Sequence, residues 1–135
     1  MHRLSNLVNI ILKPLCKHVK SFLRDGIDFL SKLSKTMIPG STLVSCDIVN
    51  LYSNIDSKLG HMAMEHWVNK HRDEIPGRFT TKFIFEALDL VITINIFYSD
   101  ANYYSQIKGV AMGTKVAPTY ATLSLGYLEV LFIMM

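Results

Sequence analysis

Cysteine is scarce in this sequence, and the two cysteines that occur do not form a known metal-binding or redox motif. Cys16 and Cys46 are the only cysteines among 135 residues, and they make neither a CxxC pair nor the spacing of a structural zinc site. This argues against a disulfide framework. Both residues are expected to be reduced, buried thiols of an intracellular protein, in the nucleus or the cytoplasm.

Charge is scarce as well, and neither sign dominates. Charged residues make up 19% of the chain and hydrophobic residues 50%, which indicates a globular chain with a core rather than a disordered one. The 14 basic and 11 acidic residues give a net charge of +3. That balance permits a nucleic-acid partner without implying one.

A long uninterrupted apolar run is also missing. The N-terminal stretch MHRLSNLVNIILKPLC is too polar for a secretory signal. Residues 116–135 are nearly all apolar, but Glu129 and several small or polar residues dilute the run below the roughly 20 apolar residues of a membrane span. A buried core helix is expected, with a membrane anchor as the alternative. No cap, glycine or basic last turn closes this helix, which is typical of a truncated end.

The histidines show no metal-binding pattern. His61, His66 and His71 follow one another at five-residue intervals, and five residues turn a helical side chain about 140° from its start. The three cannot share one helix face. The stretch HMAMEH is also not an HExxH motif, so the sequence predicts no zinc site.

Helical periodicity dominates the rest of the chain. Apolar residues recur at helical spacing over residues 4–15, 19–35, 59–74 and 80–95, and a last helix follows the loop 109–118. A strand is predicted at residues 42–48, and a hairpin at 97–99 and 103–107. The expected fold class is α+β, mostly helical with one central strand and a β-hairpin.

Asp47 stands where the predicted strand ends. Alternate residues of a strand share a face, so Cys46 and Ile48 are expected to pack on helices while Asp47 lies on the more polar face. A carboxylate there is a natural ligand for a hard cation such as Mg²⁺, and the backbone carbonyl of Ile48 can add a second oxygen. Alternatively, Asp47 caps the following turn. Tyr52, taken alone, fits a core aromatic as well as a selectivity device.

Two blocks of the chain resemble a known family. SCDIVNLYSNI, residues 45–55, resembles motif A of reverse transcriptases, and specifically the D-V-x-S-L-Y-T-N-I-P block of Penelope-like retroelements. Residues 95–129 resemble the family's next block, Y-x-Q-x-x-G-x-A-M-G followed by A-P-x-x-A. The matching residues are Asn95, Phe97, Tyr104, Gln106, Gly109, Ala111, Met112, Gly113, Ala117, Pro118, Ala121 and Glu129. Residues 21–25 also resemble the family's stretch before motif A, so the similarity covers nearly the whole chain.

The resemblance implies RNA-templated DNA synthesis, in which two Mg²⁺ ions hold the attacking 3′-oxygen and the leaving pyrophosphate in line. Asp47 matches the catalytic metal ligand of motif A, and Tyr52 matches the aromatic residue under the incoming sugar. Residues 109–118 match the motif B loop, where glycines let backbone approach a nucleotide. The implied partners are an RNA template, a DNA primer and a dNTP. The nucleotide-binding residues implied are Tyr52, Gln106, Gly109, Met112 and Gly113. Lys108 and Lys115 flank the glycines and either contact phosphate or are solvated.

The implied domain is a partial right-hand polymerase palm and fingers over residues 1–135, with a helical segment at 1–40 and the palm motifs at 41–135. Two departures limit its activity. The chain has no aromatic-x-Asp-Asp run of motif C, and the family's basic fingers segment is absent ahead of the matched region. We therefore expect a fragment that is inactive by itself and that self-associates through exposed apolar surface. The alternative is a small helical interaction protein without catalysis.

Overall fold

The chain is mostly helical over the residues that the structure describes. The computed structural model of the protein describes residues 2–134, and the side chains of residues 2–133. The elements are α1 (His2–Leu12), η1 (Lys13–His18), α2 (Gly26–Lys32), α3 (Leu51–Asn54), α4 (Ser57–Lys70), η2 (Arg72–Glu74), α5 (Thr81–Thr93), β1 (Ile96–Ser99), β2 (Asn102–Ser105) and α6 (Ala117–Met134), where η denotes a 3₁₀ helix. The α+β class, with helices and a two-stranded hairpin, is confirmed.

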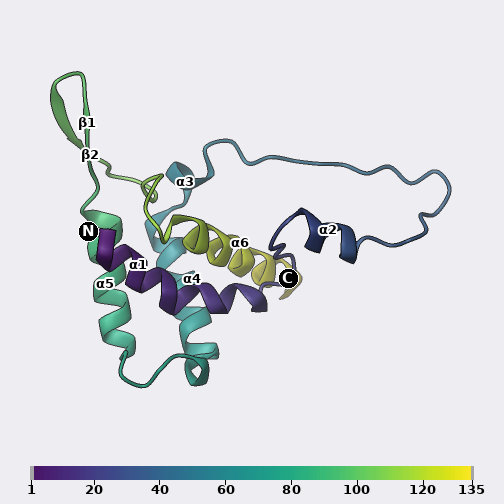
Figure 1. Cartoon of the computed structure of the whole chain (residues 1–135), viewed down its shortest axis with the longest axis horizontal. Helices are drawn as coiled ribbons and strands as arrows, with labels where there is room; N and C mark the ends of the chain where they lie inside the picture. The colour runs from purple at the N-terminus through teal and green to yellow at the C-terminus, as the bar shows by residue number, and fades with distance from the viewer. Residues whose placement is uncertain (1, 135) are drawn as a thin grey trace.

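Four helices form the body of the molecule. Helix α6 packs against α4 and η1, and α1 packs against α5 (Figure 1). Local sequence explains where two of them begin, because the side chains of Asp56 and Thr80 accept hydrogen bonds from the first turns of α4 and α5. The largest fully buried side chains include Tyr120, Leu12, Leu15, Met64, Ile84, Leu88 and Leu123. The indole Nε1 of Trp67 donates to the Leu123 carbonyl at 2.9 Å, which ties α4 to α6 inside this core.

The N-terminal helix belongs to the same core as the C-terminal half. The Ser5 hydroxyl accepts a hydrogen bond from the Val116 amide at 3.2 Å, and Thr119 donates to the Asn9 side chain at 2.6 Å. Val8, like Leu12 and Leu15, is fully buried. Residues 2–19 therefore hold the start of α6 in place.

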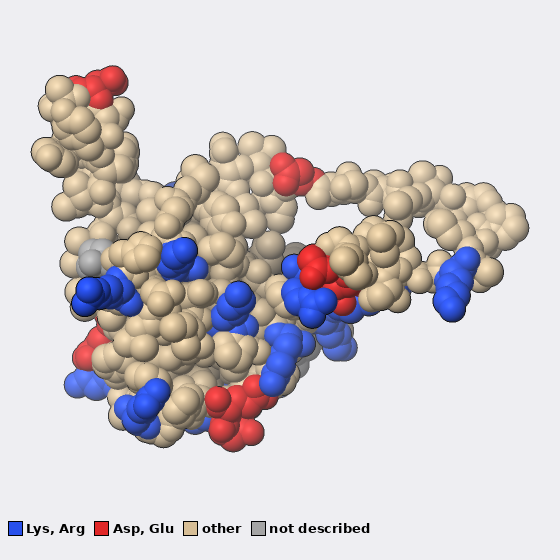
Figure 2. All heavy atoms as spheres, viewed as in Figure 1, with Lys and Arg blue, Asp and Glu red and all other residues tan. Residues whose placement is uncertain are grey.

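Residues 23–50 form an exposed arm, which is where the sequence expectations fail. The expected helix at 19–35 shrinks to α2, and the expected strand at 42–48 is an extended segment without a partner. The only strands among residues 2–134 are β1 and β2, so nothing pairs with the arm. A strand is stabilised by neighbours rather than by its own residues. Cys46 and Ile48, which were expected to pack on helices, are exposed. The arm stands away from the body of the molecule (Figure 2).

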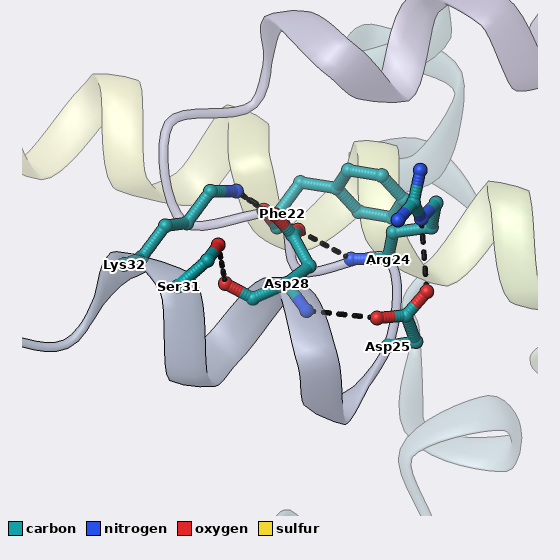
Figure 3. A network of polar contacts seen from close by, with 6 residues as sticks. All are labelled: Phe22, Arg24, Asp25, Asp28, Ser31 and Lys32. Atoms are coloured by element: carbon teal, nitrogen blue, oxygen red, sulfur yellow. Dashed lines mark hydrogen bonds and ion pairs between the residues drawn. The ribbon is translucent and has the colours of Figure 1, made fainter.

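Helix α2 is short because a polar network sets its first turn (Figure 3). Asp25 caps the helix by accepting from the Asp28 amide at 2.8 Å, and Asp28 accepts from the Arg24 amide at 3.0 Å and from Lys32 Nζ at 2.9 Å. The hydrogen bond from the Asp28 amide lowers the pKa of Asp25, with the Arg24 side chain adding to it. The Arg24 amide, and then Lys32, lower the pKa of Asp28. None of these contacts reaches the core, so α2 is ordered locally.

The predicted hairpin is confirmed, and its turn is tight. Strands β1 and β2 pair antiparallel, with Ser99 opposite Asn102. Asp100 and Ala101 form the two-residue turn with φ of 48° and 63°. Two positive φ values in a row match the turn type whose twist suits a hairpin. The strands are exposed throughout and project from the body (Figure 1).

The two cysteines differ in environment. Cys16 is buried as expected, and burial raises its pKa to about 11. Cys46 is exposed, contrary to the expectation, because it lies on the unpaired arm. Within residues 2–134, no helix combines the length and apolarity needed to cross a membrane.

Two glycines set the closest approaches to helix α6. A Cβ on Gly60 of α4 would overlap the hydroxyl of Tyr120 and lie 3.0 Å from its Cε1. A Cβ on Gly126 of α6 would lie 2.5 and 2.7 Å from the methyl groups of Val19. Real Cβ atoms do not make contacts this short, so α6 fits between its neighbours because these positions carry no side chain.

We predict that Gly60→Ala lowers the free energy of unfolding. Helix propensity alone favours alanine by about 1 kcal/mol, whereas overpacking a filled core costs about 1–3 kcal/mol. Because Tyr120 is itself buried, the overpacking cost should exceed the propensity gain, and we expect a net loss of up to about 2 kcal/mol in urea unfolding. Gly77→Ala is the control, since no atom lies within 4 Å of its added Cβ. Equal stability of the two variants would contradict the packing argument.

We also predict that helix α2 unwinds at acidic pH while α5 stays folded. The folded-state pKa values of Asp25 and Asp28 are lowered, so their contribution is complete above the ordinary aspartate pKa of about 3.9 and is lost as the pH falls through the lowered values. Helix α5 is capped by Thr80, which does not titrate. Backbone ¹³Cα chemical shifts during a titration below about pH 4 measure both helices. If α2 and α5 unfolded at the same pH, the argument that the aspartate cap stabilises α2 locally would be wrong.

Candidate functional site

Asp47 lies at the end of the exposed arm, just before the chain enters α3. Within the described residues, its carboxylate makes no hydrogen bond or ion pair, so the expected turn-capping role is not seen. Asn50 takes a left-handed conformation with φ of 53° and turns the chain into α3. Tyr52, in the first turn of α3, is half-buried and packs against the core on one side.

The glycine loop packs directly on this short helix. The Val110 amide donates to the Tyr52 carbonyl at 2.9 Å. Gly109 has φ of +73°, and a Cβ there would overlap the Tyr52 carbonyl oxygen and lie 2.6 Å from the Ser53 Cα. Only a residue without a side chain allows this approach. Gly109 therefore brings the two blocks of the sequence into contact.

Three adjoining hollows surround the contact, and Met112 lines all of them. The first also contains Asp47, Ile48 and Tyr52. The second contains Ser53, Gln106 and Lys108, and the third contains Asn95, Gln106 and Gly113. The Met112 side chain is 78% exposed between them. The structure thus gathers most of the sequence-predicted residues around one loop.

Gln106 is held in place by local hydrogen bonds. Its backbone amide donates to the Asn95 carbonyl at 2.8 Å, and its side-chain amide donates to the Lys108 carbonyl at 2.8 Å. The side-chain nitrogen is therefore engaged within the loop. Lys115 lines a different hollow, together with His2 and Ser5, and that hollow shares Asn95 and Gly113 with the third one.

The donor set around Asp47 fits a single hydrated cation. Asp47 is the only carboxylate that lines the three hollows, and Mg²⁺ bound by one carboxylate keeps most of its six positions for water. Two Mg²⁺ ions a few ångströms apart need several bridging carboxylates. The described residues do not supply them here, so they do not fit a two-metal centre.

A second cluster was missed by sequence reasoning. His18, His71 and Glu74 each offer a ligand atom within 4.8 Å of the others. The helix-face argument compared histidines along one segment, whereas His18 reaches this place from η1. The signal present in the sequence was the His71-x-x-Glu74 spacing.

Comparisons were made with protein-family models, with curated proteins and with solved structures, and nothing matches this chain.

We predict that Gly109→Ala destabilises the protein more than Gly113→Ala. Both glycines have positive φ, of +73° and +94°, so both substitutions incur left-handed strain of roughly 1–2 kcal/mol. Only Gly109 adds an overlap with backbone, because no atom lies within 4 Å of a Cβ on Gly113. Urea unfolding should therefore give a lower free energy of unfolding for Gly109→Ala than for Gly113→Ala. In Gly109→Ala alone, the amide resonances of Tyr52 and Ser53 should also shift. Identical losses of unfolding free energy in the two variants would show that the close contact between Gly109 and the backbone of Tyr52 and Ser53 does not contribute to stability.

Proposed function

We propose that this chain is the motif A to motif B part of a Penelope-like reverse transcriptase. The resemblance of residues 45–55 and 95–129 motivates the proposal, and one structural observation supports it. The hydrogen bond from Val110 to Tyr52, with Gly109 against Ser53, brings the two blocks together. A nucleotide-binding role requires that contact, since each block supplies only part of the lining.

The roles follow from where the residues lie. Asp47 offers the carboxylate for a Mg²⁺ ion that accompanies a dNTP, and Tyr52 presents a ring on the same hollow as Met112. An aromatic ring and a thioether offer apolar contact to a sugar and a base. Lys108 is the basic side chain that lines the neighbouring hollow, and it suits a phosphate. The RNA template and DNA primer are partners by the same proposal.

Polymerisation by this chain alone is not part of the proposal. One carboxylate cannot clamp the attacking and leaving oxygens between two cations, and no aromatic-x-Asp-Asp run occurs in the sequence. In primer extension on an RNA template, we expect no incorporation of dNTP by the isolated chain.

An interaction protein without catalysis is the second candidate. The exposed apolar side chains of the arm favour it, with Ile27, Ile38 and Val44 between 74% and 80% exposed. Exposed apolar surface of this kind is typical of contact with another chain or of self-association. In that case Asp47 and Tyr52 are structural residues: Asp47 lies at the end of the arm and Tyr52 packs against the core.

Paramagnetic broadening by Mn²⁺ separates the two candidates. Mn²⁺ takes oxygen ligands as Mg²⁺ does, so Mn²⁺ with a dNTP should broaden the resonances of Ile48, Tyr52 and Met112. Asp47→Asn should abolish that broadening with little change in size. Asp100→Asn is the matched control, because it removes the same charge from the exposed hairpin turn.

Two results would count against the polymerase proposal. One is broadening of these three residues that is the same in Asp47→Asn as in the wild type. The other is no broadening there at all, which would favour the interaction protein. Asp47-dependent incorporation of dNTP would instead contradict the expected inactivity.

A further inference from the structure

Two short 3₁₀ helices meet on the side of the body where α4 ends. His18 is the last residue of η1, His71 precedes η2, and Glu74 is its last residue. The His18 Nε2 and Glu74 Oε1 atoms lie 2.7 Å apart, and the His71 Nδ1 atom lies 4.0 Å from the same oxygen. The cluster therefore joins the end of η1 to the segment that follows α4.

The local fold explains why His71 and Glu74 point the same way. Side chains three residues apart eclipse one another in a 3₁₀ helix. The ring of His71 is further held by Trp67, with ring centroids 6.1 Å apart and 13° between their planes. The ring of His18 stacks on the His71 ring, with centroids 3.6 Å apart. The three groups are thus placed by backbone and packing rather than by long flexible side chains.

The imidazole of His71 has no hydrogen-bond partner among the described residues. Its Nε2 atom is buried and unpaired, and its Nδ1 lies too far from Glu74 to share a proton. An imidazole with neither nitrogen paired is uncommon in a folded protein. The Nδ1 atom, 4.0 Å from Glu74 Oε1, is therefore free to bind a metal ion.

From these observations we propose that His18, His71 and Glu74 bind a Zn²⁺ ion. Zinc with ligands at about 2.0–2.2 Å in tetrahedral geometry separates neighbouring ligand atoms by roughly 3.4 Å. The two distances to Glu74 Oε1, 2.7 and 4.0 Å, lie on either side of that value. Two imidazoles and a carboxylate are a donor set typical of Zn²⁺, whereas Mg²⁺ prefers oxygen ligands alone.

Binding requires two adjustments. The stacked rings are nearly parallel, at 7°, so they must rotate until their nitrogens converge on the ion. Lys17 Nζ donates to Glu74 Oε2 at 2.8 Å and competes with the ion for the carboxylate. Both His18 and His71 are partly exposed and Glu74 is exposed, which leaves a path for entry. Three protein ligands leave the fourth position to water.

The site is independent of the proposed nucleotide-binding role. Its ligands come from η1 and η2, and none of them lines the hollows around Met112. A bound ion would connect segments that are distant in sequence and would stabilise the folded chain, because the unfolded chain does not hold these ligands together.

Calorimetric titration of the full metal-free chain with ZnCl₂, in excess Mg²⁺, tests the proposal. We expect one Zn²⁺ per chain, a higher Tm with Zn²⁺, and zinc-dependent shifts of the His18 and His71 ring resonances. His71→Ala and Glu74→Gln should each weaken binding about tenfold or more. Lys17→Met should strengthen it, because the competing ammonium is gone.

His61→Ala is the matched control, because His61 of α4 pairs with Asp89 of α5 and is not one of the proposed ligands. This substitution should leave zinc binding unchanged. Circular dichroism in EDTA establishes that Glu74→Gln still folds. Absence of zinc binding by the wild type would overturn the proposal. Wild-type affinity in both His71→Ala and Glu74→Gln, or loss of binding in His61→Ala, would overturn it as well.

Discussion

The placement of helix α6 between α4 and the N-terminal segment is the constraint on which the rest of the structure depends. Gly60 of α4 admits the Tyr120 ring of α6, and Gly126 of α6 admits Val19, at distances that no Cβ would allow. Ser5 fixes the start of α6 through the Val116 amide. The glycine loop leads directly into α6, so the place where α6 begins also fixes the position of the loop. Gly109 and Met112 lie next to α3 for this reason.

The helical elements could be predicted because their signals are local. Asp56 and Thr80 are caps that a reader of the sequence can recognise, and the apolar spacing of α5 predicts its buried face. The hairpin was equally local, since it depends on a short turn. The predicted strand at residues 42–48 failed because strand formation depends on a partner elsewhere in the chain. Composition alone cannot supply that partner.

Part of the candidate site could likewise be predicted from the sequence, and part of it could not. The Asp47 to Tyr52 spacing and the glycine pattern are visible in the sequence, and the resemblance to a family implies a nucleotide-binding role for both. Their contact depends on the positive φ of Gly109 and on the course of α6, which no local pattern encodes. The His18 cluster was missed for a related reason. Comparing histidines along one helix cannot detect a ligand that arrives from a different segment.

The two proposed cation sites differ in how well the fold prepares them. The His71 ring already stacks with Trp67 and His18, so the backbone of the zinc site is in place and only side chains have to move before an ion binds. Asp47 stands on an exposed arm with few buried contacts, a setting in which local order is weak. Fixing the backbone of each additional residue costs about 1–2 kcal/mol, and a hydrated Mg²⁺ on one carboxylate offers little to offset it. Nucleotide binding at Asp47 therefore depends on whatever orders the arm, whereas zinc binding depends only on the body of the protein.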